Sequence, residues 1–279
     1  MRAWQVTELG EPEDVLKLVD VPDPEPGPGQ VVVKVAAAAC NFPDILLCQG
    51  RYQDRPELPF TPGMELAGEV VSVGTDAGLN VGDRVVAQPG SGGFAELAVV
   101  DARQAWEWPD GMTAPQAAGM FVTYQTGYCA LHRRARIQPG ETLLVHAAAG
   151  GVGSAAVQLG KAAGATVIAS AGGTEKCTVA SALGADHVID YSSEDLISRV
   201  KEITNGRGAD VIFDPVGGDV FDASRRVVAF EGRILVIGFV AGRFADAPTN
   251  HVLIKNYAVL GVHWGYYRRM APELIPTWQ

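Results

Sequence analysis

The chain has 279 residues, of which 22 are Lys or Arg and 32 are Asp or Glu, giving a formal charge of −10 at pH 7. This acidic balance disfavours a nucleic-acid-binding protein, because a polyanion is bound through basic patches that release counterions. The short basic run at 133–136 is interpreted as the solvated end of a helix. With 47% hydrophobic and 19% charged residues, the composition is typical of a folded globular protein with one large or two medium domains.

The sequence also bears on the cellular compartment. No apolar segment approaches the roughly 18 residues that a membrane span requires, and the first residues lack the apolar core of a secretion signal. The four cysteines, at positions 40, 48, 129 and 177, form neither a CxxC pair nor a dense framework, and we expect them to be reduced and buried. We therefore expect a soluble cytoplasmic protein that does not act at a membrane.

The first hundred residues contain short strand-like segments separated by Gly and Pro. Segments 15–19, 30–35 and 67–74 are rich in Val and Leu, and the proline-rich stretch 22–29 is expected to be a surface connector. This spacing predicts a compact antiparallel, barrel-like domain of mostly β structure.

The pattern changes near Thr113. A capping-box-like start at Thr113 and Gln116 predicts a helical run to Leu131. Strands and helices then alternate: strands are predicted at 142–146, 166–170, 187–190, 210–214, 233–238 and 258–262, and helices at 154–163, 175–183, 194–204 and 219–230. Repeated β-α units require right-handed crossovers, so this half is predicted to be a doubly wound parallel sheet with helices on both faces. The predicted fold class is α/β.

A glycine-rich hexapeptide lies at the first β-α junction of this half. Residues 151–156 fit the pattern G-x-G-x-x-G/A, directly after the strand ending at His146 and at the start of a predicted helix. In this context the glycines let a pyrophosphate approach the backbone N–H groups at the helix N-terminus. The motif therefore predicts a dinucleotide-binding site of the Rossmann type.

The end of the second strand bears on the choice of nicotinamide cofactor. An acidic residue there accepts the ribose hydroxyls of NAD, but this chain has Ser170 and Gly172 at that point. Glu175 is close, but with Thr174 as N-cap it belongs to the first turn of a helix. Lys176 is then free to approach a phosphate. We therefore favour NADPH over NADH.

The sequence contains no recognisable metal site. Its five histidines are scattered, and the closely spaced cysteines of a structural zinc site are missing. We expect no metal ion.

Several motifs together identify a family. They are Asn41-Phe42-Pro43-Asp44, the segment 59–65, Val81-Gly82-Asp83-Arg84-Val85, Gly92-Gly93-Phe94-Ala95-Glu96, and the segment 147–153. In these motifs the chain resembles the medium-chain dehydrogenase/reductase superfamily, and within it the zinc-free quinone oxidoreductase branch that includes zeta-crystallin. The resemblance extends over nearly the whole chain.

The resemblance also bears on zinc. Zinc-dependent relatives have a ligand cysteine where this chain has Asn41, and a Gly-His-Glu where it has Gly63-Met64-Glu65. Both substitutions remove metal ligands, so the resemblance implies a zinc-independent enzyme.

The resemblance implies a domain organisation and a site. Residues 1–115 with 263–279 would form a GroES-like substrate domain, residues 116–262 the NADP-binding Rossmann domain, and the cofactor would lie between them. Asn41, Asp44 and Thr126 would lie near the nicotinamide, and Tyr52 would contact the substrate. The expected cofactor-binding residues are Gly150, Gly151, Val152, Gly153, Ser170, Gly172, Lys176, Tyr191, Val216, Gly238, Phe239, His263, Trp264 and Gly265.

The activity implied is hydride transfer from NADPH to a small-molecule quinone. One alternative is an enoyl-thioester or 2-alkenal reductase, in which Tyr52 or Asn41 would donate a hydrogen bond to the enolate oxygen. A second is a structural or regulatory protein that binds NADPH without turnover. The resemblance further implies a homodimer, and family members usually continue for several dozen residues beyond position 279.

Overall fold

The computed structural model describes residues 1–53 and 55–278, which divide into two compact units, Met1–Val122 and Thr123–Gln279. Each unit has its own sheet and its own hydrophobic core. These units differ from the expected domains at residues 116–122 and 263–279. As a statement about functional domains, the expected limits remain a prediction.

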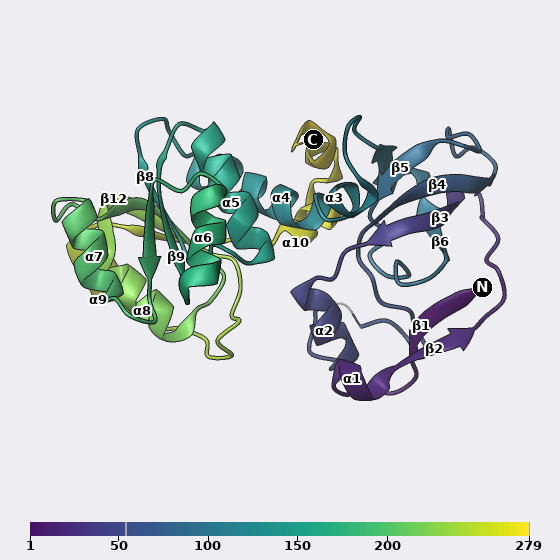
Figure 1. Ribbon diagram of the computed structural model, residues 1–279, viewed down its shortest axis with the longest axis horizontal. Coiled ribbons are helices and arrows are strands. Elements are labelled where there is room, and N and C mark those ends of the chain that lie inside the picture. Colours follow the sequence, from purple (N-terminus) through teal and green to yellow (C-terminus); the bar gives the residue numbers. More distant parts are fainter. Residues whose placement is uncertain (54, 279) are drawn as a thin grey trace. The chain divides into compact units, whose positions relative to one another are not determined.

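The first unit is built on a five-stranded sheet of order β6-β3-β4-β5-β7, in which every neighbouring pair is antiparallel (Figure 1). Its strands are β3 (Gln30–Ala38), β4 (Leu66–Val73), β5 (Arg84–Ala87), β6 (Leu97–Asp101) and β7 (Ala105–Glu107). A separate two-stranded ribbon joins β1 (Arg2–Val6) to β2 (Leu16–Asp20). The expected antiparallel, mostly β domain is confirmed.

Valine and alanine side chains from one face of this sheet form its core, among them Val31, Val33, Val70 and Val85. Successive side chains of a strand point to opposite faces, and on the opposite face Val32 and Val86 are buried as well. Short helices complete the unit: α1 (Pro12–Val15), α2 (Phe42–Cys48), the 3-10 helix Ala102–Gln104 and α3 (Ala114–Ala118).

The second unit contains a six-stranded sheet of order β10-β9-β8-β11-β12-β13 with every neighbouring pair parallel. Its strands are β8 (Thr142–Val145), β9 (Thr166–Ala171), β10 (His187–Asp190), β11 (Ala209–Asp214), β12 (Val228–Val236) and β13 (Ala258–Gly261). The order runs outward from β8 in both directions, which confirms the predicted doubly wound sheet and its six strands.

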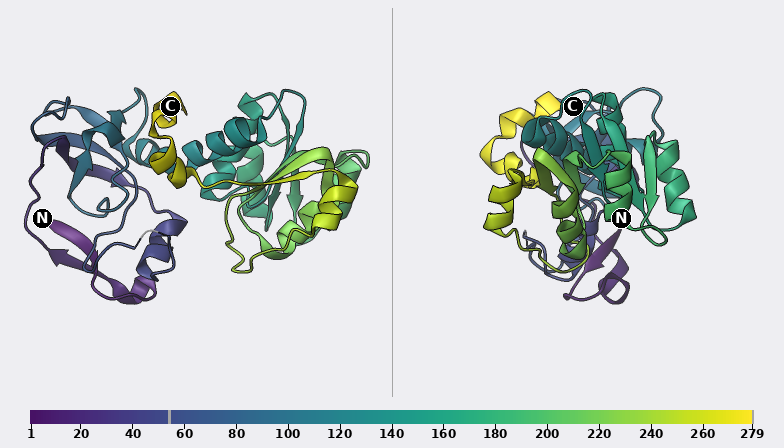
Figure 2. Two further views of the ribbon diagram at one scale, coloured as in Figure 1. Left: turned by 180° about the vertical axis from the view of Figure 1, so that it is seen from behind. Right: turned by 90° about the vertical axis from the view of Figure 1, so that its left-hand side faces the viewer.

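Helices cover both faces of this sheet (Figures 1 and 2). On one face lie α5 (Gly151–Ala162) and α6 (Thr174–Ala182), and on the other α7 (Leu196–Ile203), α8 (Gly218–Val227) and α9 (Thr249–Lys255). The segment before the sheet forms α4 (Phe121–Tyr128) and a π-helix (Cys129–Ala135); the last described residues form α10 (Trp264–Met270) and a 3-10 helix (Pro272–Trp278). None of the helices described is both long and apolar enough to cross a bilayer.

Three local predictions were wrong. The helix predicted over 219–230 ends at Val227, because Val228 pairs with Ala209 in the sheet and so begins β12. The helical run predicted to Leu131 is divided after α3 and continues as α4 and a π-helix. The N-cap of α6 is Gly173, with φ of 85°, and Thr174 is already helical. Glycine adopts a positive φ without steric strain. The preference of threonine for N-cap positions therefore did not identify the residue at which this helix begins.

The cysteines are all free, as expected for reduced thiols, but their burial varies. Cys48 and Cys129 are buried, and burial raises the pKa of the Cys129 thiol to about 11. Cys40 is exposed, so the expectation that all four are buried was wrong. It lies between β3 and α2, where the chain leaves the sheet.

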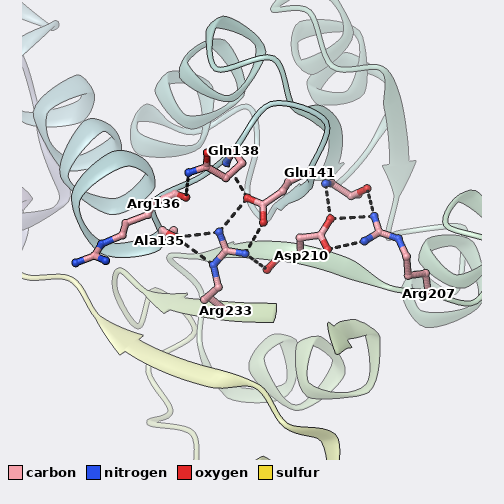
Figure 3. Close-up of polar contacts among 8 residues, drawn as sticks. Ala135, Arg136, Gln138, Glu141, Arg207, Asp210 and Arg233 are labelled. Atoms are coloured by element: carbon pink, nitrogen blue, oxygen red, sulfur yellow. Dashed lines mark hydrogen bonds and ion pairs between the residues drawn. The ribbon is translucent and has the colours of Figure 1, made fainter. Parts of the chain in front are cut away.

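A partly buried arginine ties the segment before β8 to the sheet (Figure 3). The Arg233 guanidinium on β12 donates to both carboxylate oxygens of Glu141, at 2.7 and 2.9 Å. It also donates to the carbonyl of Ala135, at 3.1 and 2.8 Å, and to that of Asp210, at 3.3 Å. The planar fork of arginine thus satisfies the carbonyl at the end of the π-helix and a carboxylate at the same time.

Replacing Arg233 by methionine is expected to lower the free energy of unfolding by about 2 to 4 kcal/mol, because Glu141 then keeps a half-buried charge without its partner. Urea unfolding monitored by circular dichroism measures this change. The control is Arg103→Met, which breaks the Arg103–Asp101 pair; its arginine side chain is 88% exposed, so a loss below about 1 kcal/mol is expected. Equal losses in the two variants would contradict the structural role of Arg233.

Candidate functional site

The carboxyl edge of the parallel sheet collects most of the predicted cofactor residues. Strands β8 and β11 are neighbours in the sheet, and the chain passes from β8 to α5 on one face and from β11 to α8 on the other. In open α/β sheets, ligands bind at this switch point. The predicted residues follow the strand ends in turn: 150–153 after β8, 170 and 172 at β9, 191 after β10, 216 after β11, 238 and 239 after β12, and 263–265 after β13.

The turn between β8 and α5 has the geometry expected for a pyrophosphate. Gly150 is the N-cap of α5 and supplies no side-chain cap, so the first N–H groups of this helix are left for another acceptor. Gly150 and Gly151 are exposed, whereas Gly153 is buried. A Cβ built on Gly153 would lie 2.2 Å from the Ala147 carbonyl oxygen, so only glycine allows the helix to approach the turn this closely. The residues present therefore fit a dinucleotide.

The junction of β9 and α6 carries the residues expected around an adenosine phosphate. A Cβ on Gly172 would lie 2.8 Å from the ring of Tyr191, so this tyrosine covers the backbone of Gly172. Lys176 lies exposed in the first turn of α6, and the structure shows no hydrogen bond or ion pair to it from the described residues. Its ammonium group is therefore available to an anion at the start of α6.

An acidic residue that sequence reasoning missed lies at the same junction. Asp190, the last residue of β10, accepts hydrogen bonds at Oδ1 from the Gly173 N–H (2.9 Å) and from the N–H and hydroxyl of Ser192. The bond from the Ser192 hydroxyl, with these two backbone N–H groups, lowers the pKa of Asp190. The carboxylate belongs to a neighbouring strand, so the residue type at the end of β9 alone could not reveal it.

Ser170 is expected to contact the cofactor, but its hydroxyl has a partner inside the protein. The buried ring of His146 lies between two serines, with Nδ1 3.0 Å from the Ser170 Oγ and Nε2 2.9 Å from the Ser224 Oγ. Ser224 donates its own proton to the Val220 carbonyl, so it accepts from Nε2–H, and Nδ1 accepts from Ser170. Burial lowers the pKa of His146, in accordance with this neutral form. The role of Ser170 in binding cofactor remains a prediction.

The loops after β11 and β12 lie against each other. Asp214 Oδ1 accepts from the N–H groups of Val216 and Gly217, at 2.8 and 2.9 Å, and so shapes the first loop. In the second loop, Phe239 lies so close that a Cβ on Gly217 would be 3.0 Å from its ring. Phe239 is 40% exposed and packs edge-on against Phe244. The structure thus brings together Val216, Gly238 and Phe239.

The last predicted cofactor residues begin α10. His263 is its exposed N-cap, Trp264 is buried, and Gly265 follows in the first turn. This segment follows β13, whose register with β12 is continued by a bond from the Val262 N–H to the Val236 carbonyl. It therefore lies at the same carboxyl edge.

The first unit holds a second group of predicted residues, at the start of α2. Asn41 is the N-cap of this helix and forms a capping box with Asp44, whose Oδ2 accepts from the Asn41 N–H at 2.8 Å. Asp44 Oδ1 accepts from the Gly63 N–H at 3.0 Å. The Asn41 amide group donates from Nδ2 to Glu65 Oε1, at 2.9 Å. Asn41 and Asp44 are thus brought together with Glu65, which sequence reasoning did not single out.

Both carboxylates of this group are buried, Asp44 at 5% exposure and Glu65 at 1%. Burial raises the pKa of each, against the opposing effect of the hydrogen bonds that they accept. Met64, which precedes Glu65 in the sequence, is buried in an apolar cluster with Leu47 and Phe60. Across the described part of the chain, no three His, Cys, Asp or Glu side chains are grouped so that they could share a metal ion.

The other two predicted catalytic residues are half-buried. Tyr52 follows α2 and packs against the cluster that contains Leu47, Phe60 and Met64. Thr126 lies on α4, in the second compact unit. Their expected roles near the substrate and the nicotinamide remain predictions.

Known proteins share this combination of features. Residues 27–110 match the family described as alcohol dehydrogenase GroES-like domain, and residues 151–278 match the family described as zinc-binding dehydrogenase. Quinone oxidoreductase-like protein 2 of Bos taurus is 44% identical over 242 residues, which are 86% of this chain and 69% of that relative. The chain belongs to the medium-chain dehydrogenase/reductase superfamily. Within this superfamily it belongs with the zinc-free quinone oxidoreductases.

Solved medium-chain reductases have the same fold. The Escherichia coli quinone oxidoreductase complexed with NADPH is 32% identical with a TM-score of 0.88, and the likeness covers 99% of this chain and 87% of that one. The CurK enoyl reductase is 28% identical with a TM-score of 0.87, covering 99% and 85%. These likenesses confirm the predicted GroES-like and Rossmann domains and the α/β class. The protein is therefore an oxidoreductase of this superfamily.

Proposed function

We propose that this medium-chain oxidoreductase uses NADPH to reduce a quinone, without a metal ion. The observation that carries the proposal is the junction of β9 and α6, where Lys176 is exposed without a partner among the described residues and the end of β9 itself carries no side-chain carboxylate. A lysine at this position attracts the 2′-phosphate that distinguishes NADPH from NADH. The likeness to a quinone oxidoreductase complexed with NADPH supports the same choice.

The proposed binding residues act through backbone and shape. Gly150, Gly151, Val152 and Gly153 would hold the pyrophosphate at the start of α5. Ser170, Gly172, Lys176 and Tyr191 would surround the adenosine phosphate, and the loops after β11, β12 and β13 would line the nicotinamide side, with Val216, Gly238, Phe239, His263, Trp264 and Gly265. When bound, NADPH supplies the hydride, and the protein supplies position.

On the substrate side, Asn41, Asp44 and Thr126 would lie near the nicotinamide and Tyr52 would contact the quinone. A quinone that accepts a hydride, with its two electrons, spreads the negative charge over its oxygens and takes a proton from water to become the hydroquinone. No dedicated acid is needed. Asn41, which is held by its hydrogen bond to the buried Glu65 carboxylate, provides a polar group of fixed orientation that does not itself gain or lose a proton.

A second candidate function is the reduction of an enoyl thioester or a 2-alkenal, favoured by the likeness to the CurK enoyl reductase. In that reaction the enolate oxygen needs a hydrogen-bond donor, and the amide of Asn41 or the hydroxyl of Tyr52 would provide it. A third candidate, a structural or regulatory protein, would bind NADPH without turnover.

The absorbance of NADPH or NADH at 340 nm separates these functions. The purified protein is mixed with each cofactor and then with a quinone, an enal or a saturated aldehyde, and each reaction is run with and without EDTA. Oxidation of NADPH by the quinone is the expected result. Turnover with the enal alone would move the assignment to the alkene reductases, and binding of NADPH without turnover would favour the third candidate. Reduction of the aldehyde that is lost with EDTA would contradict the zinc-independent assignment.

We also propose a homodimer formed through an outer edge of the parallel sheet. Among the described strands, β13 has β12 as its single neighbour, and an open strand edge invites pairing with another chain. Sedimentation velocity measures the oligomeric state; a monomer at micromolar concentration would contradict the proposal.

A further inference from the structure

Glu65 is a buried carboxylate that the proposed reaction does not use. It precedes β4 directly, is 1% exposed, and forms hydrogen bonds to two different helices of the protein. Oε1 accepts from Nδ2 of Asn41, at the start of α2, at 2.9 Å. Oε2 accepts from the N–H of Val122, in the first turn of α4, at 2.7 Å. The N–H of Phe121 also hydrogen-bonds to this carboxylate.

The first bond determines which way the Asn41 amide faces. An ionised carboxylate can only accept hydrogen bonds, so the atom of Asn41 that faces Glu65 must be the NH2 group. The capping box places the amide oxygen toward the first turn of α2. Of the two N–H bonds of this NH2 group, one is directed to Glu65, and the structure shows no other bond from Nδ2 to the described residues. Glu65 thus presents the second N–H in a single orientation.

The second bond fixes the start of α4. The first four N–H groups of a helix have no partner within the helix, and those of Phe121 and Val122 are satisfied by Glu65. A negative charge is also favourable at a helix N-terminus. Thr126 lies on the same helix, one turn beyond Val122. One carboxylate therefore holds both Asn41 and the first turn of α4.

Among the described residues, no cation balances the charge of Glu65. Its charged neighbour is Asp44, and the described residues form no ion pair with either carboxylate. Burial raises the pKa of Glu65, so the folded protein binds this proton more tightly than the unfolded chain does. The ionised group therefore opposes folding at a pH above its raised pKa, and this effect fades as the pH falls.

We propose that Glu65 is a positioning residue, which orients the Asn41 amide and the start of α4 for hydride transfer. The proposal rests on the proposed function, in which Asn41 and Thr126 lie beside the nicotinamide. It differs from a purely structural role in one measurable respect. Loss of either bond should slow the chemical step, while the glycine turn after β8 and the start of α6 would still hold the cofactor.

The experiment compares Glu65→Gln with Glu69→Gln. Glutamine has the shape of glutamate, but its NH2 group must face either the Asn41 amide or the Val122 N–H, so one bond is lost and two donors oppose each other. For Glu65→Gln we expect kcat with the quinone to fall about 10- to 100-fold, with the Kd of NADP+ within about twofold of the parent value. Glu69 is exposed on the same strand β4, so Glu69→Gln should leave both constants unchanged.

Hydrogen exchange gives a readout that does not depend on turnover. Peptides covering 41–48 and 119–128 should exchange faster in Glu65→Gln, and peptides covering 151–162 at the parent rate. If wild-type protein oxidises no NADPH with any acceptor, the proposed function fails. The exchange data then still show whether Glu65 stabilises the starts of the two helices. Unchanged exchange in both segments, or an unchanged kcat in a folded variant, would overturn the proposal.

Glu65→Asp covers the case in which the glutamine variant does not fold. Aspartate keeps the charge but is shorter by one methylene, so it can reach Asn41 or Val122 less well. We expect the kcat of Glu65→Asp to be lower than that of the wild-type protein, but by less than the fall expected for Glu65→Gln. Exchange should be faster in one of the two segments. Wild-type kcat and exchange in Glu65→Asp would contradict the positioning role.

Discussion

Replacing Gly153 by alanine is expected to reduce the affinity for NADP+ by at least about 100-fold, because the glycine turn must open to admit a methyl group. The added Cβ would lie 2.2 Å from the Ala147 carbonyl oxygen and 3.0 Å from the Cα of Ala148. Both are backbone atoms, so no side-chain rotation relieves the contact. Displacing the turn moves the N–H groups at the start of α5 away from the pyrophosphate that they would bind.

Isothermal titration with NADP+ measures this loss, and circular dichroism verifies that the variant is folded. Gly261→Ala is the matched control, since its Cβ would meet no atom within 4 Å and Gly261 does not have a positive φ. Its affinity should equal that of the parent protein. An unchanged Kd in folded Gly153→Ala would show that this turn is not the pyrophosphate site.

Replacing Lys176 by glutamate is expected to reverse the cofactor preference. The KM for NADPH should rise on the order of 100-fold, because a cation facing the 2′-phosphate is exchanged for an anion, whereas the KM for NADH should change little. Folding should be preserved, since Lys176 is exposed in the first turn of α6, where an acidic side chain is favourable. The buried glycine turn after β8 is untouched by the substitution.

Steady-state oxidation of both cofactors with one acceptor tests this expectation. Lys17→Glu makes the same change of charge at an exposed position on β2, in the first unit, and controls for the overall field of the protein. An equal effect in the two variants would assign the change to overall charge. A constant ratio of kcat/KM for NADPH and NADH in Lys176→Glu would remove Lys176 from phosphate recognition. Asp190, held by the Gly173 N–H, would then be the residue to examine for binding of the ribose.

The alternation of elements in the second half was predictable because it depends on local patterns. Apolar runs of four to six residues between glycine and helical segments identify strands without any knowledge of their neighbours, and the order of such units permits few topologies. The glycine turn was predictable for the same reason. The misplaced end of α8 shows where local patterns fail, because Val228 leaves the helix to pair with Ala209, nineteen residues earlier in the chain.

The polar partners at the site depended on packing. Asn41 and Asp44 were identified by a resemblance, but nothing within a few residues of Asn41 indicates that its amide faces Glu65, which is 24 positions away. The contact of Glu65 with Val122 spans 57 positions, and that of His146 with Ser224 spans 78. Such pairs arise only when strands and helices are packed, because burial then removes water and leaves each polar group to find a protein partner.

The sequence by itself therefore determined a mostly β half, a doubly wound α/β half and the glycine turn at Gly150–Gly153, since each depends on residue type and spacing along the chain, and the family resemblance added the replacement of zinc ligands at Asn41 and Met64. The tertiary structure decided that Ser170 donates to His146, that Asp190 approaches the start of α6, and that one buried carboxylate holds both α2 and α4. The spacing of apolar residues reveals the periodicity of helices and strands. The partner of a buried polar group depends instead on which elements pack around it and exclude water, and these elements are distant in the sequence.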